Sequence, residues 1–174
     1  LAGTQACVAV LVTMYGEQVI YVHSESGIGA SDLRFTRGRS LPLMSGAASK
    51  VILAHQPATR LKRVFQHHAG TEHAAQIGTT MADFLKYFRS IRQRGVYISK
   101  SEIEEQITGV AAPIFNVNGD VTSCLTLTFN HELHPEYEAE HFAPLVQGCA
   151  RDVSLRLAKS RAGETLPKSP VLSR

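Results

Sequence analysis

Hydroxyl and thiol side chains gather on one face of a predicted β-strand at residues 121–129. Successive side chains of a strand point to opposite faces, which places Cys124, Thr126 and Thr128 together. If this face of the sheet is covered, these polar groups need hydrogen-bond partners, which a polar ligand can supply. If the face meets water, the preference of threonine for strands explains the same residues. The strand alone leaves a ligand site and a solvated sheet face both open.

A second candidate for ligand chemistry is the start of a predicted helix at residues 45–55. Met44 precedes this helix, and Gly46, Ala47 and Ala48 give its first turn small side chains. The first backbone N–H groups of a helix lack partners within the helix and favour anions, so a ligand carboxylate can approach closely here. Close packing of the helix on a sheet also requires small residues. Both interpretations stay open.

Signs of catalysis, metal binding or cofactor binding are weak. The sequence has no Gly-x-Ser-x-Gly, phosphate-binding-loop or dinucleotide-binding motif, so we expect no catalytic residues and no cofactor. His131 and His134 have a metal-like spacing, but no cysteine or carboxylate completes the set, and we interpret the histidines as surface residues. An enzyme that uses Cys7 or Cys124 remains an alternative. It requires an activated thiolate with a base nearby, and no histidine is near either cysteine in sequence.

A sheet and several helices are needed to position these residues. Apolar segments predict strands at residues 6–14, 18–24, 33–35, 96–99, 109–116 and 121–129. Helical spacing predicts helices at residues 45–55 and 58–68, a third from Thr79 or Thr80 to Arg94, and a fourth at about residues 136–159. The last helix is expected to bury Val146, Ala150, Val153 and Leu157. Because the first strand is apolar on both faces, we predict an α+β fold in which helices cover both faces of an antiparallel sheet.

The bulk composition fits one folded domain at residues 1–160. Of the 174 residues, 44% are hydrophobic and 19% are charged, which is typical of globular proteins. The longest apolar segment, residues 6–12, is too short to cross a membrane, and three widely spaced cysteines fit a reducing compartment. We therefore expect a cytoplasmic protein with no secretion signal and no membrane partner. Residues 161–174 are predicted to form a disordered tail.

The charge pattern argues against DNA binding by this chain itself. The net charge is only +3, whereas a duplex-binding domain usually presents a concentrated basic face. Arg60, Lys62 and Arg63 come nearest to such a face, and we interpret them as one solvated side of a helix. The acidic cluster at residues 102–105 is interpreted as solvated in the same way.

Two segments resemble the effector-binding domain of the IclR family of bacterial transcriptional regulators. Residues 37–43 (RGRSLPL), followed by Ala47, Ala48 and Lys50, resemble the family pattern around its Pro-Leu-His-Ala helix start. Residues 91–119, which include IRQRGV, Glu102 and VAAPIFNVNG, resemble a second family pattern. The resemblance covers about residues 4–158. It implies a GAF-like domain, a separate N-terminal winged helix-turn-helix that this chain lacks, and assembly into homodimers or tetramers.

The resemblance also implies a function and a set of site residues. Family members change operator occupancy when a small organic acid binds, so we expect an effector sensor rather than an enzyme, with operator DNA as a partner only through the N-terminal domain. By position, the backbone amides of the pocket match Gly46, Ala47 and Ala48. Its side-chain positions match Ser99, Gly109, Thr126 and Thr128, with Cys124 beside them.

Departures from the family pattern bear on the identity of the effector. Met44 stands where the family usually has histidine, Ser49 replaces a glycine before Lys50, and Gln106 replaces another glycine. Gly109 leaves room and Met44 makes one wall more apolar, which favours an aromatic or branched acid. A second alternative is an assembly domain with a vestigial pocket.

Overall fold

The computed structural model describes residues 5–30, 35–68 and 70–161, and within them the strands form one antiparallel sheet. The strand order is β3-β2-β1-β6-β5-β4. The strands are β1 (Cys7–Tyr15), β2 (Gln18–Ser26), β3 (Ser40–Pro42), β4 (Tyr97–Lys100), β5 (Ile107–Phe115) and β6 (Val121–Asn130). Gly119 turns between β5 and β6 with φ 82°, a left-handed conformation that glycine adopts at no steric cost. The antiparallel pair β1–β6 joins the first hairpin to the last one.

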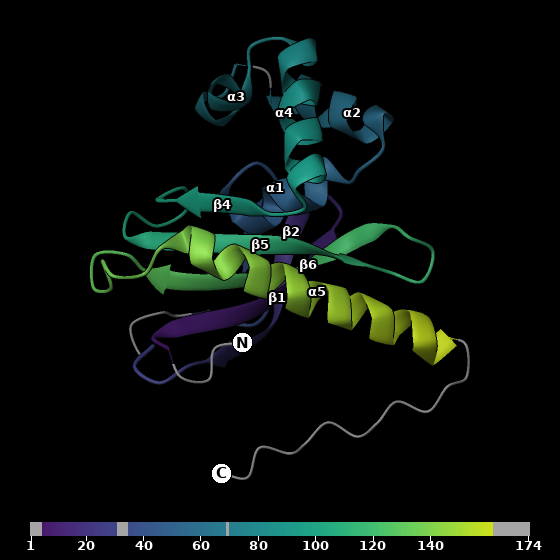
Figure 1. The fold of residues 1–174 in the computed structure, drawn as a ribbon. Helices are drawn as coiled ribbons and strands as arrows, with labels where there is room; N and C mark the ends of the chain where they lie inside the picture. The colour runs from purple at the N-terminus through teal and green to yellow at the C-terminus, as the bar shows by residue number, and fades with distance from the viewer. Residues whose placement is uncertain (1–4, 31–34, 69, 162–174) are drawn as a thin grey trace.

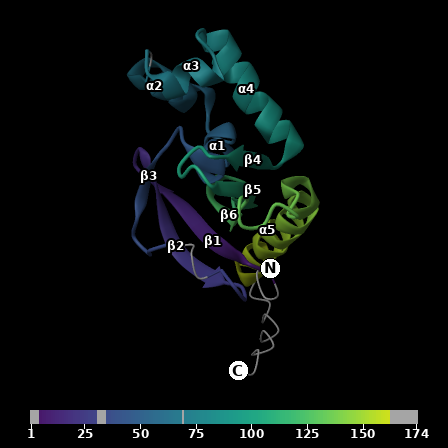
Figure 2. The same cartoon turned by 90° about the vertical axis from the view of Figure 1, so that its left-hand side faces the viewer.

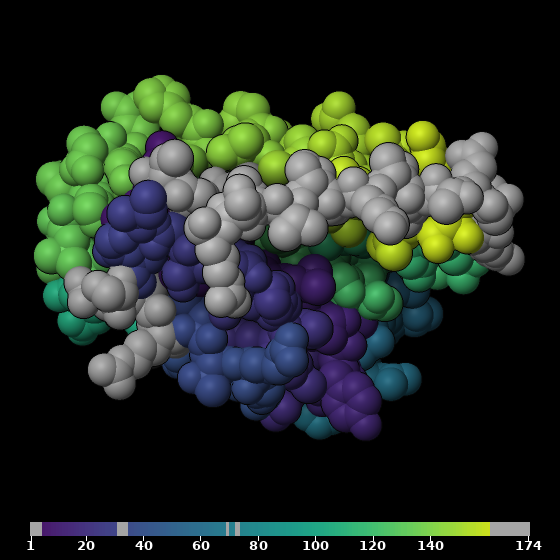
Figure 3. All heavy atoms as spheres, turned by 90° about the horizontal axis from the view of Figure 1, so that it is seen from below, coloured from purple at the N-terminus to yellow at the C-terminus, as the bar shows by residue number. Residues whose placement is uncertain are grey.

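Helices cover both faces of the sheet, as the apolar first strand predicted. They are α1 (Gly46–Ala54), α2 (Ala58–His68), α3 (Glu72–Ile77), α4 (Met81–Arg94) and α5 (Ala139–Arg161). Figures 1 and 2 show α1 on one side of β5 and β6 and α5 on the other, while α2, α3 and α4 form a further layer beyond α1. Seen from below, α5 and the first hairpin form opposite sides of the molecule (Figure 3). The α+β fold with an antiparallel sheet is confirmed.

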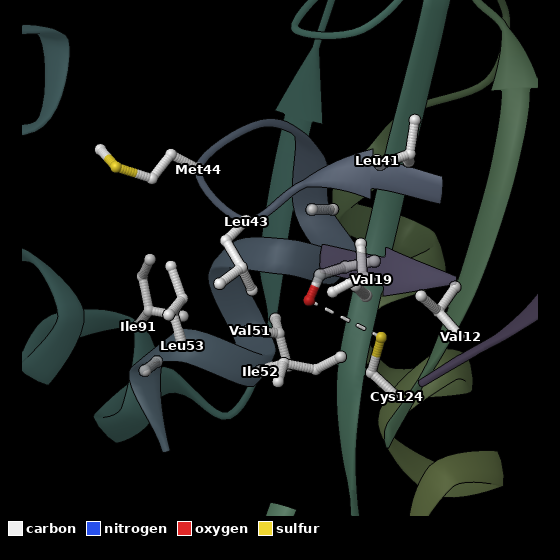
Figure 4. Close-up of a cluster of buried hydrophobic side chains, with 14 of the residues drawn as sticks. Val12, Val19, Leu41, Leu43, Met44, Val51, Ile52, Leu53, Ile91 and Cys124 are labelled. Atoms are coloured by element: carbon white, nitrogen blue, oxygen red, sulfur yellow. Dashed lines mark hydrogen bonds between the residues drawn. The ribbon is translucent and has the colours of Figure 1, made fainter. Parts of the chain in front are cut away.

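Two hydrophobic cores lie on the two sides of the sheet. On the α1 side, Val10, Val12 and Cys124 pack with Val51 and Ile52. The thiol of Cys124 donates to the backbone oxygen of Ala48 over 3.8 Å, as the close-up in Figure 4 shows. On the α5 side, the core includes Val110, Leu127, Phe129, Phe142 and Val146. The threonine face of β6 is therefore covered by α1.

The third strand differs from the prediction. Residues 33 and 34 of the predicted strand lie outside the described residues, and Phe35 is not in a strand. The strand that pairs with β2 is Ser40–Pro42, with Leu41 opposite Val19. It lies at the edge of the sheet, where proline is tolerated because no further strand needs its missing N–H.

The final helix is less buried than predicted. Val146 and Ala150 are buried, but 37% of Val153 and 43% of Leu157 are exposed, so the prediction for these two residues was wrong. Figure 1 shows the reason, since the C-terminal end of α5 projects away from the sheet. The short helix α3 was not predicted, although Thr71 caps it by accepting a hydrogen bond from the Ala74 N–H.

In the described part of the chain, no helix combines the length and apolar character needed to cross a membrane. The tail predicted at residues 161–174 lies, from residue 162 onward, outside the described residues.

Candidate functional site

The polar wall of the candidate site is built by the register of three neighbouring strands. Ser99 of β4 pairs with Gly109 of β5, and Gly109 pairs with Thr128 of β6. Thr126 lies two residues along the same face of β6, opposite Val10 of β1. All of these side chains are buried, with Thr126 and Thr128 only 5% and 6% exposed. Residues far apart in sequence thus lie side by side, with the hydroxyl residues Ser99 and Thr128 on either side of the gap left by Gly109.

A cavity of about 40 Å³ lies between this wall and the start of α1. Ala47 and Ala48 border it from α1, opposite Gly109. Its apolar lining comprises Val10, Val12, Tyr21, Phe35, Leu41, Ile103 and Ile107. A buried water needs roughly 10–15 Å³ of such space, so the cavity holds a few waters at most. A branched or aromatic acid requires the walls to move.

The first amides of α1 are already hydrogen-bonded within the protein. The Gly46 N–H donates to Oε2 of Glu102 over 2.9 Å, and the Ala47 N–H donates to Oγ of Ser99 over 3.1 Å. Gly46 has φ 79°, and a Cβ on it would lie 2.3 Å from Cδ1 of Ile103. A side chain at Gly46 would therefore collide with the segment between β4 and β5.

Glu102 is the centre of a partly buried polar network that the sequence analysis missed. Its Oε2 lies 2.7 Å from Nζ of Lys50, whose side chain is only 6% exposed. The Tyr97 hydroxyl donates to Glu102 Oε1 over 2.9 Å, and the Tyr87 hydroxyl donates to that of Tyr97 over 2.8 Å. Burial raises the pKa of Tyr97, and the hydrogen bond that its hydroxyl donates to the Glu102 carboxylate raises it further, which keeps the phenol protonated.

The interpretation of the acidic cluster as solvated is therefore wrong for Glu102, whose side chain is 20% exposed. Glu104 borders the cavity and pairs with Arg39 over 2.9 Å, while Glu105 is exposed. One signal could have revealed the network. Lys50 lies in the middle of a helix whose other residues are small or apolar, and a buried ammonium needs a counter-ion.

Six of the nine predicted site residues border the cavity: Ala47, Ala48, Ser99, Gly109, Thr126 and Thr128. Met44, Gly46 and Cys124 do not border it. Met44 is buried in the core on the α1 side, and Figure 4 shows it pointing away from Cys124. Gly46 lies beneath Ile103. The apolar lining from β1 and β2 was not predicted, although the alternation of the first hairpin could have indicated it.

The thiol of Cys124 does not suit nucleophilic catalysis. Burial raises its pKa to about 12, and the hydrogen bond with Thr126 opposes this only in part. A nucleophilic cysteine needs its thiolate form near neutral pH. Among the described residues, no group of three or more histidine, cysteine or acidic side chains is arranged to hold a metal ion.

Comparison with known proteins assigns this arrangement to a family. Residues 4–155 match the sequence model described as bacterial transcriptional regulator IclR C-terminal. The chain belongs to the IclR family. It is 22% identical over 141 residues to the HTH-type transcriptional regulator KdgR of Escherichia coli strain K12, an alignment that covers 81% of this chain and 54% of KdgR. The chain spans about half the length of the curated relatives that it matches.

Solved structures of IclR-family domains have the same fold. The C-terminal domain of E. coli KdgR has a TM-score of 0.69 at 22% identity, covering 88% of each chain. IclR of Thermotoga maritima has a TM-score of 0.72 at 23% identity, covering 87% of this chain and 61% of its own. The GAF-like fold expected for an IclR C-terminal domain is confirmed. The curated relatives are transcriptional regulators rather than enzymes.

Proposed function

We propose that this IclR-family domain senses a small organic acid and thereby changes how the regulator occupies its operator. The observation that carries the proposal is the row of Ser99, Gly109 and Thr128, with Thr126 beside it, facing the start of α1 across a buried cavity. In this proposal the DNA contact is made by the winged helix-turn-helix expected in the full-length protein. The regulator acts in the cytoplasm as a homodimer or tetramer.

The chemistry of the lining supports a ligand with a polar end and an apolar body. Hydroxyl groups both donate and accept hydrogen bonds, so Ser99 and Thr126 can bind oxygen atoms of a ligand. Val10 and Val12, on the strand next to Thr126, and Leu41 offer apolar surface beside these hydroxyl groups. Such a lining, mostly apolar with a few convergent polar groups, is typical of small-molecule sites.

A thermal-shift screen of small organic acids tests the proposal. At least one acid should raise the melting temperature, because a ligand that binds only the folded state stabilises it. The double variant Thr126→Val, Thr128→Val should lose this shift while staying folded. Thr122→Val is the matched control, since Thr122 lies on the same strand but is exposed. The site assignment is wrong if no acid stabilises the protein, or if the double variant responds like the wild type.

One observation favours the alternative of an assembly domain with a vestigial pocket. The cavity holds only about 40 Å³, which is too small for a branched or aromatic acid in the described conformation. Analytical ultracentrifugation alongside the screen separates the two hypotheses. A chain that self-associates fully and binds none of the acids fits the assembly domain.

A further inference from the structure

We propose that Glu102 is a built-in competitor for the effector. In the closed form its carboxylate lies next to the cavity, against the Gly46 N–H and Lys50. The carboxylate of the ligand replaces it when residues 101–106, here called the 101–106 segment, move outward. This inference rests on the proposed function and explains how that site admits an acid and selects for it.

The first argument is space. Most of the cavity wall consists of strand and α1 residues that are almost completely buried, such as Val10, Ala47 and Thr128. The 101–106 segment is the most exposed part of the wall, because Ile103 is 39% exposed and the side chain of Glu104 is 53% exposed. Moving packed strands disrupts the core, whereas moving this segment disturbs fewer buried apolar contacts. The segment is therefore the wall that opens.

The second argument is how the segment is held. Ser101 has φ 56°, a left-handed conformation that is unfavourable for a residue with a side chain. Two carboxylate contacts oppose this cost, one from Glu102 to α1 and one from Glu104 to Arg39. The Ser101 N–H donates to the Ile107 oxygen, which closes the loop at its base. Backbone hydrogen bonds anchor the C-terminal end of the segment, where the His131 N–H donates to the Gln106 oxygen. The contacts between Glu102 and α1 are the ones that a ligand carboxylate can replace.

The third argument is charge. Lys50 is almost completely buried, and its one ion pair among the described residues is with Glu102. If the 101–106 segment opens without a ligand, the ammonium of Lys50 loses its counter-ion inside the protein, which is costly. A ligand carboxylate removes this cost, and a neutral ligand does not. The site therefore favours anions, even though the carboxylate of Glu102 occupies it in the closed form.

The positions of the Glu102 partners also define the ligand. One carboxylate oxygen accepts from the Gly46 N–H and Lys50, and the other accepts from the Tyr97 hydroxyl. Ile103 lies beside this group, directly above Gly46. In a monocarboxylate with a short branched or aromatic body, the carboxylate replaces that of Glu102 and the body replaces the apolar side chain of Ile103.

The test compares Glu102→Gln with wild type, using isobutyrate and benzoate as probes and isobutyramide and benzamide as their neutral counterparts, at constant ionic strength. Calorimetry should show that Glu102→Gln binds the acids on the order of tenfold more tightly than wild type. In the wild type the closed form dominates, and the apparent affinity falls in proportion to the small fraction of open molecules. The amides should gain nothing. Glu105→Gln is the matched control, since it removes the same charge from an exposed position in the same segment.

Hydrogen exchange on the wild-type protein is the second measurement and needs no variant. Adding the acid should speed exchange in the 101–106 segment and slow it in β6. The inference is overturned if exchange in the segment is unchanged, if acids bind Glu102→Gln no more tightly than wild type, or if amides gain equally. If acids bind the wild type but bind Glu102→Gln no more tightly, or if the amides gain equally, only the role of Glu102 is wrong and the proposed function still stands. If none of the organic acids binds either wild type or Glu102→Gln, the proposed function fails as well.

Discussion

Replacing Gly109 by alanine should weaken ligand binding strongly while changing the stability of the fold only slightly. The added methyl group would lie 3.2 Å from Oγ of Ser99, 3.6 Å from Cβ of Ala47 and 3.7 Å from Cγ2 of Thr128. It would therefore enter the space between the polar wall and α1, in a cavity of about 40 Å³. Gly109 is not among the glycines with positive φ, so alanine brings no backbone strain.

The effect on the free energy of unfolding should be small because two terms oppose each other. Replacing glycine by alanine at a compatible position stabilises a protein by about 0.4–1 kcal/mol through the unfolded state. The close contact pushes the Ser99 hydroxyl by a few tenths of an ångström and weakens its bond from the Ala47 N–H. Such a bond contributes about 0.5–1.5 kcal/mol. The net change should stay within about 1 kcal/mol.

Ligand affinity should fall much more than stability. Inserting a methyl group into a fitted space costs about 1–3 kcal/mol, which corresponds to roughly five- to 150-fold in the dissociation constant. Urea unfolding measures the stability, and calorimetry with an acid from the screen measures the affinity. Gly148→Ala is the control, because no atom lies within 4 Å of the new Cβ and α5 lies on the opposite face of the sheet. A folded Gly109→Ala variant that binds the acid normally would refute the placement of the ligand beside Gly109.

Two further predictions follow from buried titratable groups. Burial lowers the pKa of His55 below 6.5, and its hydrogen bond to Val51 opposes this only in part. The stability that the neutral ring contributes is present above pH 6.5 and is lost as the pH falls from there towards the folded-state pKa. In urea titrations at several pH values, His55→Asn should reduce this loss of stability at acidic pH. An unchanged dependence of stability on pH would contradict the role assigned to His55. Iodoacetamide at neutral pH should label Cys149 first and Cys7 and Cys124 only after unfolding, because the last two are buried and burial raises the pKa of both thiols. Rapid labelling of native Cys124, detected by mass spectrometry, would instead restore the hypothesis of a cysteine enzyme.

Local patterns in the sequence determined most of the elements. The helix predicted at residues 58–68 has those bounds in the structure, and Thr80 caps α4 as one of the two residues proposed. The apolar pattern of β1 correctly indicated a sheet covered on both faces, which buries Thr126 and Thr128. These predictions succeeded because side-chain spacing along a strand or helix fixes which residues share a face.

The tertiary structure decided what lies opposite those faces. Gly46 and Glu102 are 56 positions apart in sequence, and the contact between them depends on how α1 sits against the end of β4. Residue types alone led us to interpret Glu102 as a solvated acid, and they gave no indication that Lys50 is its partner. The size of the cavity and the exposure of Leu157 likewise depend on where neighbouring elements end. Periodicity in a sequence carries no information about such distances, because they are set by sheet register and by the packing of whole elements.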